Sequence, residues 1–178
     1  MLKLLHDDLL ARLKGLDEEV ALTLDGDDRY YMIIVGGSAL VLRRLRDTAT
    51  HDIDVVSNSK ELFPYLDKYD INTRVEAYIN CFPYNFEDRV EMLHKGRRID
   101  FYTVSLEDAV IAKLYAMRPQ DALDISSEQV LGKLDWALLD KLATDSGEAQ
   151  ASALNERSYS IFLDAYADYA RRHRPCVN

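Results

Sequence analysis

The chain has 178 residues, of which 48% are hydrophobic and 30% are charged, a balance typical of an ordinary globular domain. Its formal net charge of −9 argues against non-specific binding to nucleic acid, because neutralised phosphates supply most of that affinity; a specific RNA acceptor is still allowed. Only two cysteines, and no uncharged apolar run of about 20 residues, predict a protein of the reducing cytoplasm without a membrane span.

Strands and helices alternate in the first part of the chain. Leucines at helical spacing predict an amphipathic helix over residues 2–14. Residues 30–35 form a continuous apolar run rich in β-branched and aromatic side chains, which indicates a buried strand. Gly36, Gly37 and Ser38 end this run before a short helix. Further strands are predicted over residues 52–56, 74–79 and 98–104, and a helix over residues 60–68.

The pattern becomes helical from Ser105 onward. Ser105 and Asp108 have the spacing of a capping box, and Pro119 is expected to end the helix that they begin. Two apolar stripes later in the chain predict further helices. This order predicts an α/β (α+β) fold. A mixed β-sheet core flanked by helices would occupy residues 1–104, and a helical C-terminal part packed on it would occupy residues 105–178.

Two aspartates stand two positions apart on the second predicted strand. Alternation points Asp52 and Asp54 to one face, while Ile53 faces the core. Two carboxylates about 7 Å apart on a strand repel each other unless the face is wet or a cation lies between them. Magnesium is commonly held by one or two carboxylates together with substrate phosphates. The pair therefore favours a metal–triphosphate site, and the alternative is a harmless solvent-exposed strand edge.

The glycine-rich turn adds a second element of such a site. Gly36 and Gly37 follow a buried strand and open a helix, where backbone N–H groups can approach a phosphate and the helix N-terminus favours anions. The hydroxyl of Ser38 would add one more donor. A plain strand-to-helix turn is the alternative interpretation.

Two further residues extend the hypothesis. Asp100 alternates with apolar neighbours on the strand predicted at 98–104, so it would share a face with Asp52 and Asp54 if the strands are neighbours. Three carboxylates can hold two magnesium ions, and Asp100 would also be placed as general base. The alternative is a surface acid beside two arginines. Lys113 lies on an apolar helical stripe, so it needs an acid or a nucleotide phosphate as partner, or extends to the helix edge.

The order of these motifs resembles the minimal nucleotidyltransferases of the DNA polymerase β superfamily over about residues 30–125. The superfamily pattern is a glycine–serine pair after a strand, two aspartates on the next motif strand, and a later acid. In this chain the matching residues are Gly37, Ser38, Asp52, Asp54 and Asp100.

More narrowly, the chain resembles the AbiEii-type toxin branch. That branch has a Gly-Gly opening, here Gly36 and Gly37, and a threonine shortly before Asp-Ile-Asp, here Thr50. It continues with a helix of the kind that runs here from Ser105 to Leu114, followed by an arginine and an Asp-x-x-Asp pair. These last residues are Arg118, Asp121 and Asp124.

The resemblance implies Mg²⁺, an NTP donor and transfer of an NMP to a hydroxyl acceptor, which in relatives includes tRNA or protein, and often a paired antitoxin protein. It implies that Asp52, Asp54 and Asp100 bind metal and, with Lys113, serve catalysis. It implies nucleotide contacts by Gly36, Gly37, Ser38, Thr50, Lys113, Asp121 and Asp124. Two alternatives stay open: a non-catalytic nucleotide-binding or protein-interaction module of this fold, and a small-molecule (antibiotic) nucleotidyltransferase, whose cationic acceptor would suit the acidic chain.

Overall fold

The computed structural model describes residues 5–48 and 50–175. It divides into two compact units, one of Met1–Tyr78 with Val90–Val104 and one of Ile79–Arg89 with Ser105–Asn178. Relative to the expected division at residues 104 and 105, the segment 79–89 joins the helical unit. No helix in the described ranges is long and apolar enough to cross a membrane.

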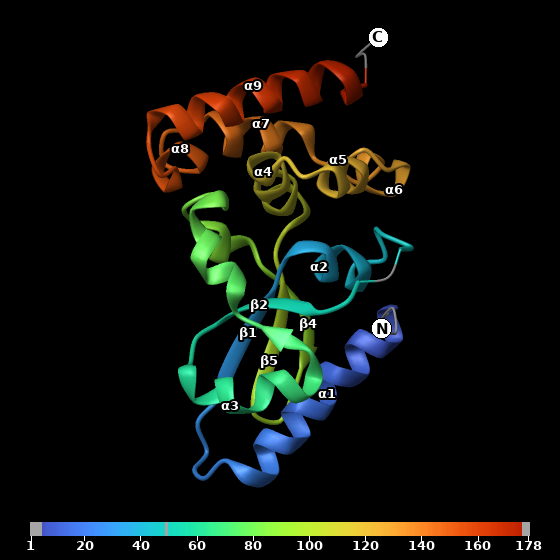
Figure 1. Ribbon diagram of the computed structural model, residues 1–178, viewed down its shortest axis with the longest axis vertical. Helices are drawn as coiled ribbons and strands as arrows, with labels where there is room; N and C mark the ends of the chain where they lie inside the picture. Colours follow the sequence, from blue (N-terminus) through green and yellow to red (C-terminus); the bar gives the residue numbers. More distant parts are fainter. Residues whose placement is uncertain (1–4, 49, 176–178) are drawn as a thin grey trace. The chain divides into compact units, whose positions relative to one another are not determined.

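The first unit is built on a mixed sheet (Figure 1). In the described residues the sheet has five strands in the order β3-β2-β1-β5-β4. β1 pairs with β5 in parallel and with β2 antiparallel, β2 pairs with β3 in parallel, and β4 pairs with β5 antiparallel. The strands are β1 (Tyr30–Ile34), β2 (Ile53–Ser57), β3 (Ile71–Asn72), β4 (Glu91–Lys95) and β5 (Ile99–Thr103).

Helices complete this unit. α1 (His6–Thr23) precedes the sheet, α2 (Gly36–Leu42) follows β1, and three short turns, η1 (Lys60–Leu62), α3 (Phe63–Leu66) and η2 (Asp67–Tyr69), connect β2 to β3. α1 runs nine residues beyond the predicted end at 14. Its buried Asp17 accepts hydrogen bonds from the backbone N–H groups of Arg97, Arg98 and Ile99, so this late part of the helix fixes the start of β5.

The two faces of the sheet differ in burial. Alternate residues on one face are almost fully buried, as Met32, Ile34 and Phe101 illustrate. On the opposite face Tyr31 and Met92 are exposed. The period of two therefore gives the sheet one well-covered face and one less covered face, and Asp54 and Asp100 lie on the less covered one.

The second unit is helical. It contains η4 (Phe86–Arg89), α4 (Leu106–Ala116), α5 (Pro119–Ile125), α6 (Glu128–Leu131), α7 (Trp136–Thr144), α8 (Ala149–Ser152) and α9 (Glu156–His173). α4 packs against α5, α7 and α9. At its centre the ring of Phe162 stacks on Tyr115 with centroids 4.3 Å apart. α4 ends at a left-handed Met117, and Pro119 begins α5.

One predicted strand is wrong. Residues 74–79 lie in the 3₁₀ segment η3 (Arg74–Cys81), in which Tyr78 is 65% exposed and therefore lacks the burial that a sheet position would give it. β3 and β4 were not predicted, because β3 has only two residues and the edge strand β4 exposes Met92.

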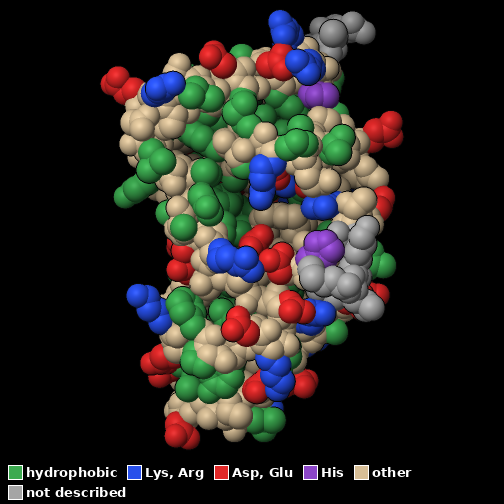
Figure 2. All heavy atoms as spheres, in the orientation of Figure 1, with side chains coloured by type: hydrophobic (Ala, Val, Ile, Leu, Met, Phe, Trp, Pro, Cys, Tyr) green, Lys and Arg blue, Asp and Glu red, His purple; other side chains and the backbone are tan. Residues whose placement is uncertain are grey.

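On the face in Figure 2, Lys and Arg side chains are interspersed with Asp and Glu, so that face has no continuous basic surface.

Candidate active site

The glycine turn and Asp54 lie directly against each other. The antiparallel register of β1 and β2 continues into a hydrogen bond of 2.9 Å from the Val35 N–H to the Asp54 carbonyl. Gly36 has a left-handed φ of 63°, and a Cβ added to it would lie 3.1 Å from an Asp54 carboxylate oxygen. Gly36 is therefore required both for its backbone conformation and for this close approach.

We expect Gly36→Ala to lower the free energy of unfolding by about 1–2 kcal/mol, the usual cost of a left-handed non-glycine residue. The added methyl group should also displace the Asp54 carboxylate and weaken any function that depends on it. Urea unfolding of the variant measures the first effect. Gly147→Ala is the control, because Gly147 lacks a left-handed φ; an equal loss in both variants would contradict the argument.

The remaining residues of the turn have definite partners. A Cβ on Gly37 would lie 2.5 Å from a guanidinium nitrogen of Arg46 and 3.9 Å from the Thr50 hydroxyl, so Arg46 lies across the turn and Thr50 is close to it. Ser38 is 1% exposed, and its hydroxyl donates to the Val35 carbonyl at 2.8 Å. A hydroxyl has one proton to donate, and in Ser38 that proton goes to the backbone carbonyl of the turn. From the sequence, a phosphate was expected as its acceptor.

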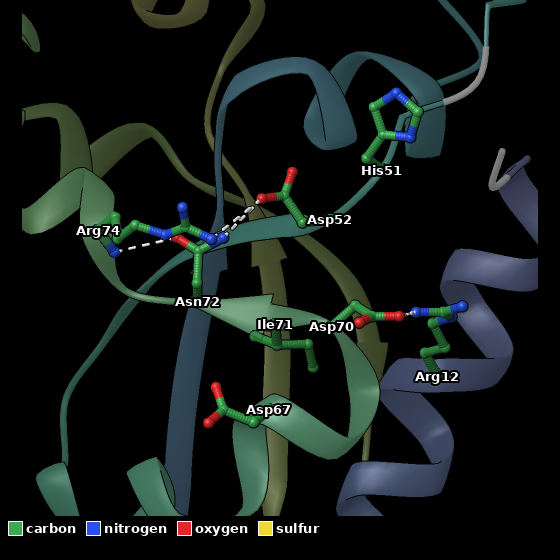
Figure 3. Close-up of a pocket in the computed structure, with 8 residues that line it drawn as sticks. All are labelled: Arg12, His51, Asp52, Asp67, Asp70, Ile71, Asn72 and Arg74. Carbon is green, nitrogen blue, oxygen red and sulfur yellow. Dashed lines mark hydrogen bonds and ion pairs between the residues drawn. The ribbon is translucent and has the colours of Figure 1, made fainter. Parts of the chain in front are cut away.

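Asp52 lies just before β2 and is held from β3. The Asn72 side-chain amide donates to one Asp52 carboxylate oxygen at 3.0 Å, and the Arg74 guanidinium is 3.7 Å from the same oxygen (Figure 3). Asn72 is also the register partner of Asp54. The Thr50 hydroxyl donates to the Asp52 backbone carbonyl at 3.3 Å. The structure therefore brings together Gly36, Gly37, Thr50, Asp52 and Asp54.

Asp100 does not join this group. On β5 it pairs with Tyr31, whereas Asp54 is bonded to Val35 at the other end of β1. Four residues along a strand correspond to about 13 Å. The Asp100 carboxylate instead forms a 2.6 Å ion pair with Arg29. The register thus corrects the expected meeting of three carboxylates, although alternation keeps Asp100 on the same face of the sheet as Asp54.

The donor set that is left suits a hard cation bound together with its substrate. Asp52 and Asp54 are carboxylates, Asp52 is 40% exposed, and both contacts described above use one of its two oxygens. Magnesium is commonly bound by one or two carboxylates plus phosphates, so this pair fits it. No group of three or more His, Cys, Asp or Glu able to hold a metal occurs in the described residues.

Lys113, Asp121 and Asp124 form a separate buried cluster in the second unit. The Lys113 ammonium donates to Asp121 and to Asp124, each at 2.7 Å, and Lys113 is 5% exposed. Arg118 also donates to Asp121 at 2.6 Å. From the sequence, an acid or a nucleotide phosphate was considered as the partner of Lys113, and in the structure its partners are these two aspartates. The expected contact of these residues with a nucleotide stays a prediction.

The Asp121 carboxyl should make stability depend on acidity. Burial raises its pKa, but hydrogen bonds from Arg118 and Lys113 outweigh burial and hold the pKa below 3.8. A lowered pKa contributes stability above the unfolded value, and this contribution is lost as the pH falls through the folded value. Urea unfolding at about pH 6 and about pH 3 should therefore show a difference between wild type and Asp121→Asn that shrinks in acid; a constant difference would contradict the prediction.

Sequence reasoning missed Asn72, Arg74 and Arg12. All three line a cavity of about 380 Å³ that adjoins Asp52, together with His51, Asp67, Asp70 and Ile71 (Figure 3). β3 is too short to show a period, so no pattern marked Asn72 as a neighbour of Asp52.

Its mixed sheet flanked by helices places the protein among the nucleotidyltransferase-like α+β folds. A family model described as "Nucleotidyltransferase of unknown function (DUF6036)" matches residues 11–174, and the chain belongs to this family. Neither the curated proteins nor the solved structures gave a match.

Proposed function

We propose that the protein is a magnesium-dependent nucleotidyltransferase that moves an NMP from an NTP to a hydroxyl acceptor. The observation that carries the proposal is the contact between the Gly36 turn and the Asp54 carboxylate, with Asp52 held by Asn72, the register partner of Asp54. This arrangement combines backbone N–H groups suited to phosphate with oxygen ligands suited to a hard cation. Membership of the family supports nucleotidyl transfer in general.

In this proposal Asp52 and Asp54 hold Mg²⁺, and the turn at Gly36 and Gly37, with Thr50, lies along the phosphates. The ion, when bound, supplies charge neutralisation for the triphosphate. The acceptor hydroxyl gives up its proton to solvent water as its oxygen forms a bond to the α-phosphorus, the bond to the bridging oxygen breaks, and pyrophosphate leaves with that electron pair. Asn72 keeps Asp52 in place through its 3.0 Å hydrogen bond. Asp100 receives no role as general base, because its carboxylate is paired with Arg29.

Transfer of label from [α-³²P]NTP, compared with [γ-³²P]NTP, tests the proposal with each of the four nucleotides. Label from the α-position alone, lost with EDTA and in Asp52→Asn and Asp54→Asn, is expected. Equal labelling by the wild type and both variants would contradict it.

A second candidate function is a non-catalytic module of the same fold that binds a nucleotide or a protein. The position of Asp100 favours it, since a site with two acids lacks the third carboxylate of the superfamily pattern. Calorimetry separates the two: NTP affinity that does not change between Mg²⁺ and EDTA would favour the module.

The finer form of the first proposal is a toxin of the AbiEii type, with tRNA or protein as acceptor and an antitoxin protein as partner. Growth arrest on expression of the wild type, but not of Asp54→Asn, would support it. An antibiotic nucleotidyltransferase would instead confer resistance without arrest. Contacts of Lys113, Asp121 and Asp124 with the nucleotide belong to the same finer proposal.

A further inference from the structure

The pocket beside Asp52 has no assigned ligand. Its volume of about 380 Å³ lies within the range of small-molecule sites, roughly 300–1,000 Å³. Arg12 comes from α1, His51 and Asp52 from the entry to β2, and the other lining residues from the segment 67–74 (Figure 3). All belong to the first unit, so one compact body forms the whole pocket.

The lining disfavours a nucleobase. Of the eight lining residues, Ile71 alone is apolar and none is Phe, Tyr or Trp. Stacking on such rings is the usual source of base affinity, so the base of the donor nucleotide would gain little here.

The charges of the pocket disfavour an anion. Asp52, Asp67 and Asp70 face two guanidinium groups. Arg12 is already committed, because it pairs with Asp70 and donates to the Tyr69 carbonyl at 3.3 Å. A phosphate would therefore meet more negative than available positive charge.

The groups still available include both hydrogen-bond donors and acceptors. Asp67 and His51 are exposed and have no side-chain partner in the part of the chain that the structure describes. Arg74 is 81% exposed and only loosely paired with Asp52, at 3.7 Å. A carboxylate accepts from hydroxyl groups, whereas guanidinium and imidazole N–H groups donate to their oxygens. A ring with several hydroxyl groups can satisfy both sets at once.

We infer that this pocket binds the acceptor and that the acceptor is a polyhydroxylated ring, one hydroxyl of which is presented beside Asp52. The role as acceptor rests on the proposed function, whereas the binding of the ring does not. A free sugar or cyclic polyol and the terminal ribose of an RNA share this chemistry.

Saturation-transfer NMR tests the binding without any nucleotide, with D-ribose and myo-inositol as probes. At least one probe should bind saturably, and Asp67→Asn should weaken its binding about tenfold, since a hydrogen bond to a charged group is lost. Asp164→Asn, an exposed aspartate of α9, is the matched control and should bind like the wild type. No saturable binding of either probe, or equal binding by wild type and Asp67→Asn, would overturn the inference.

Transfer from [α-³²P]NTP then identifies the source of the ring. Label should move either to the small polyol, or to RNA with an intact terminal ribose and not to RNA oxidised by periodate. Label found only on protein side chains would overturn the inference. Probe binding that depends on Asp67, without any transfer by the wild type, would refute the proposed function and leave the ligand class standing. Nucleotidyl transfer that is equally fast in the wild type and in Asp67→Asn would leave the proposed function standing and refute the inference about this pocket.

Discussion

Asp54→Asn should lower the rate of nucleotidyl transfer by at least about 100-fold, the scale on which loss of one transition-state electrostatic contact is felt. The amide keeps the shape of the side chain beside Gly36 but removes the charge that would hold the cation. Asp100→Asn should change the rate by less than about threefold, because it removes only the partly exposed ion pair with Arg29, and such pairs contribute little. Initial rates at saturating NTP measure both.

The paired comparison isolates the register of the sheet as the cause. Both variants replace one carboxylate on the same face of the sheet, and they differ in the end of β1 beside which that carboxylate lies. Urea unfolding of each variant shows whether a lost rate reflects a lost fold. A fall with folded Asp100→Asn as large as that with Asp54→Asn would mean that the third acid reaches the site after all.

The sequence predicted the strands whose side chains are buried on at least one face of the sheet. β1, β2 and β5 have apolar runs or clear alternation, and residues 30, 53 and 99 begin them in the structure. The same reasoning placed a strand at 74–79, because the apolar residues of η3 alternate although Tyr78 is exposed. A period reports the spacing of apolar residues, and the neighbour that buries them lies elsewhere in the chain.

The same limit explains the candidate site. Gly36 lies against Asp54 because β1 and β2 are antiparallel neighbours in the sheet. Asp100 depended on the register of β5 against β1, which the hydrogen bonds of Asp17 in α1 help to fix from about 80 residues away. No pattern local to residues 98–104 contains that information.

The burial of Lys113 could be predicted from the sequence, but its partners could not. A lone lysine on an apolar stripe indicated a buried charge, and in the structure Asp121 and Asp124 lie 2.7 Å from its ammonium group.

We expect Lys113→Met to lower the free energy of unfolding by about 3–5 kcal/mol, because two carboxylates with 3% exposed side chains lose their shared cation. Methionine fills a similar volume, so the loss would report charge more than packing. Urea unfolding measures it.

Lys141→Met is the matched control, because Lys141 is exposed in the same unit, and it should change stability by less than about 0.5 kcal/mol. Adding Asp124→Asn to Lys113→Met should restore part of the loss, since one of the two buried carboxylates that lost the lysine becomes neutral, with Arg118 still bound to Asp121. This recovery separates an internal ion cluster from a phosphate-binding lysine. If Lys113→Met kept wild-type stability and weakened only NTP binding, the lysine would serve the nucleotide instead, because a cation that stabilises its own aspartates cannot be removed without cost to the fold.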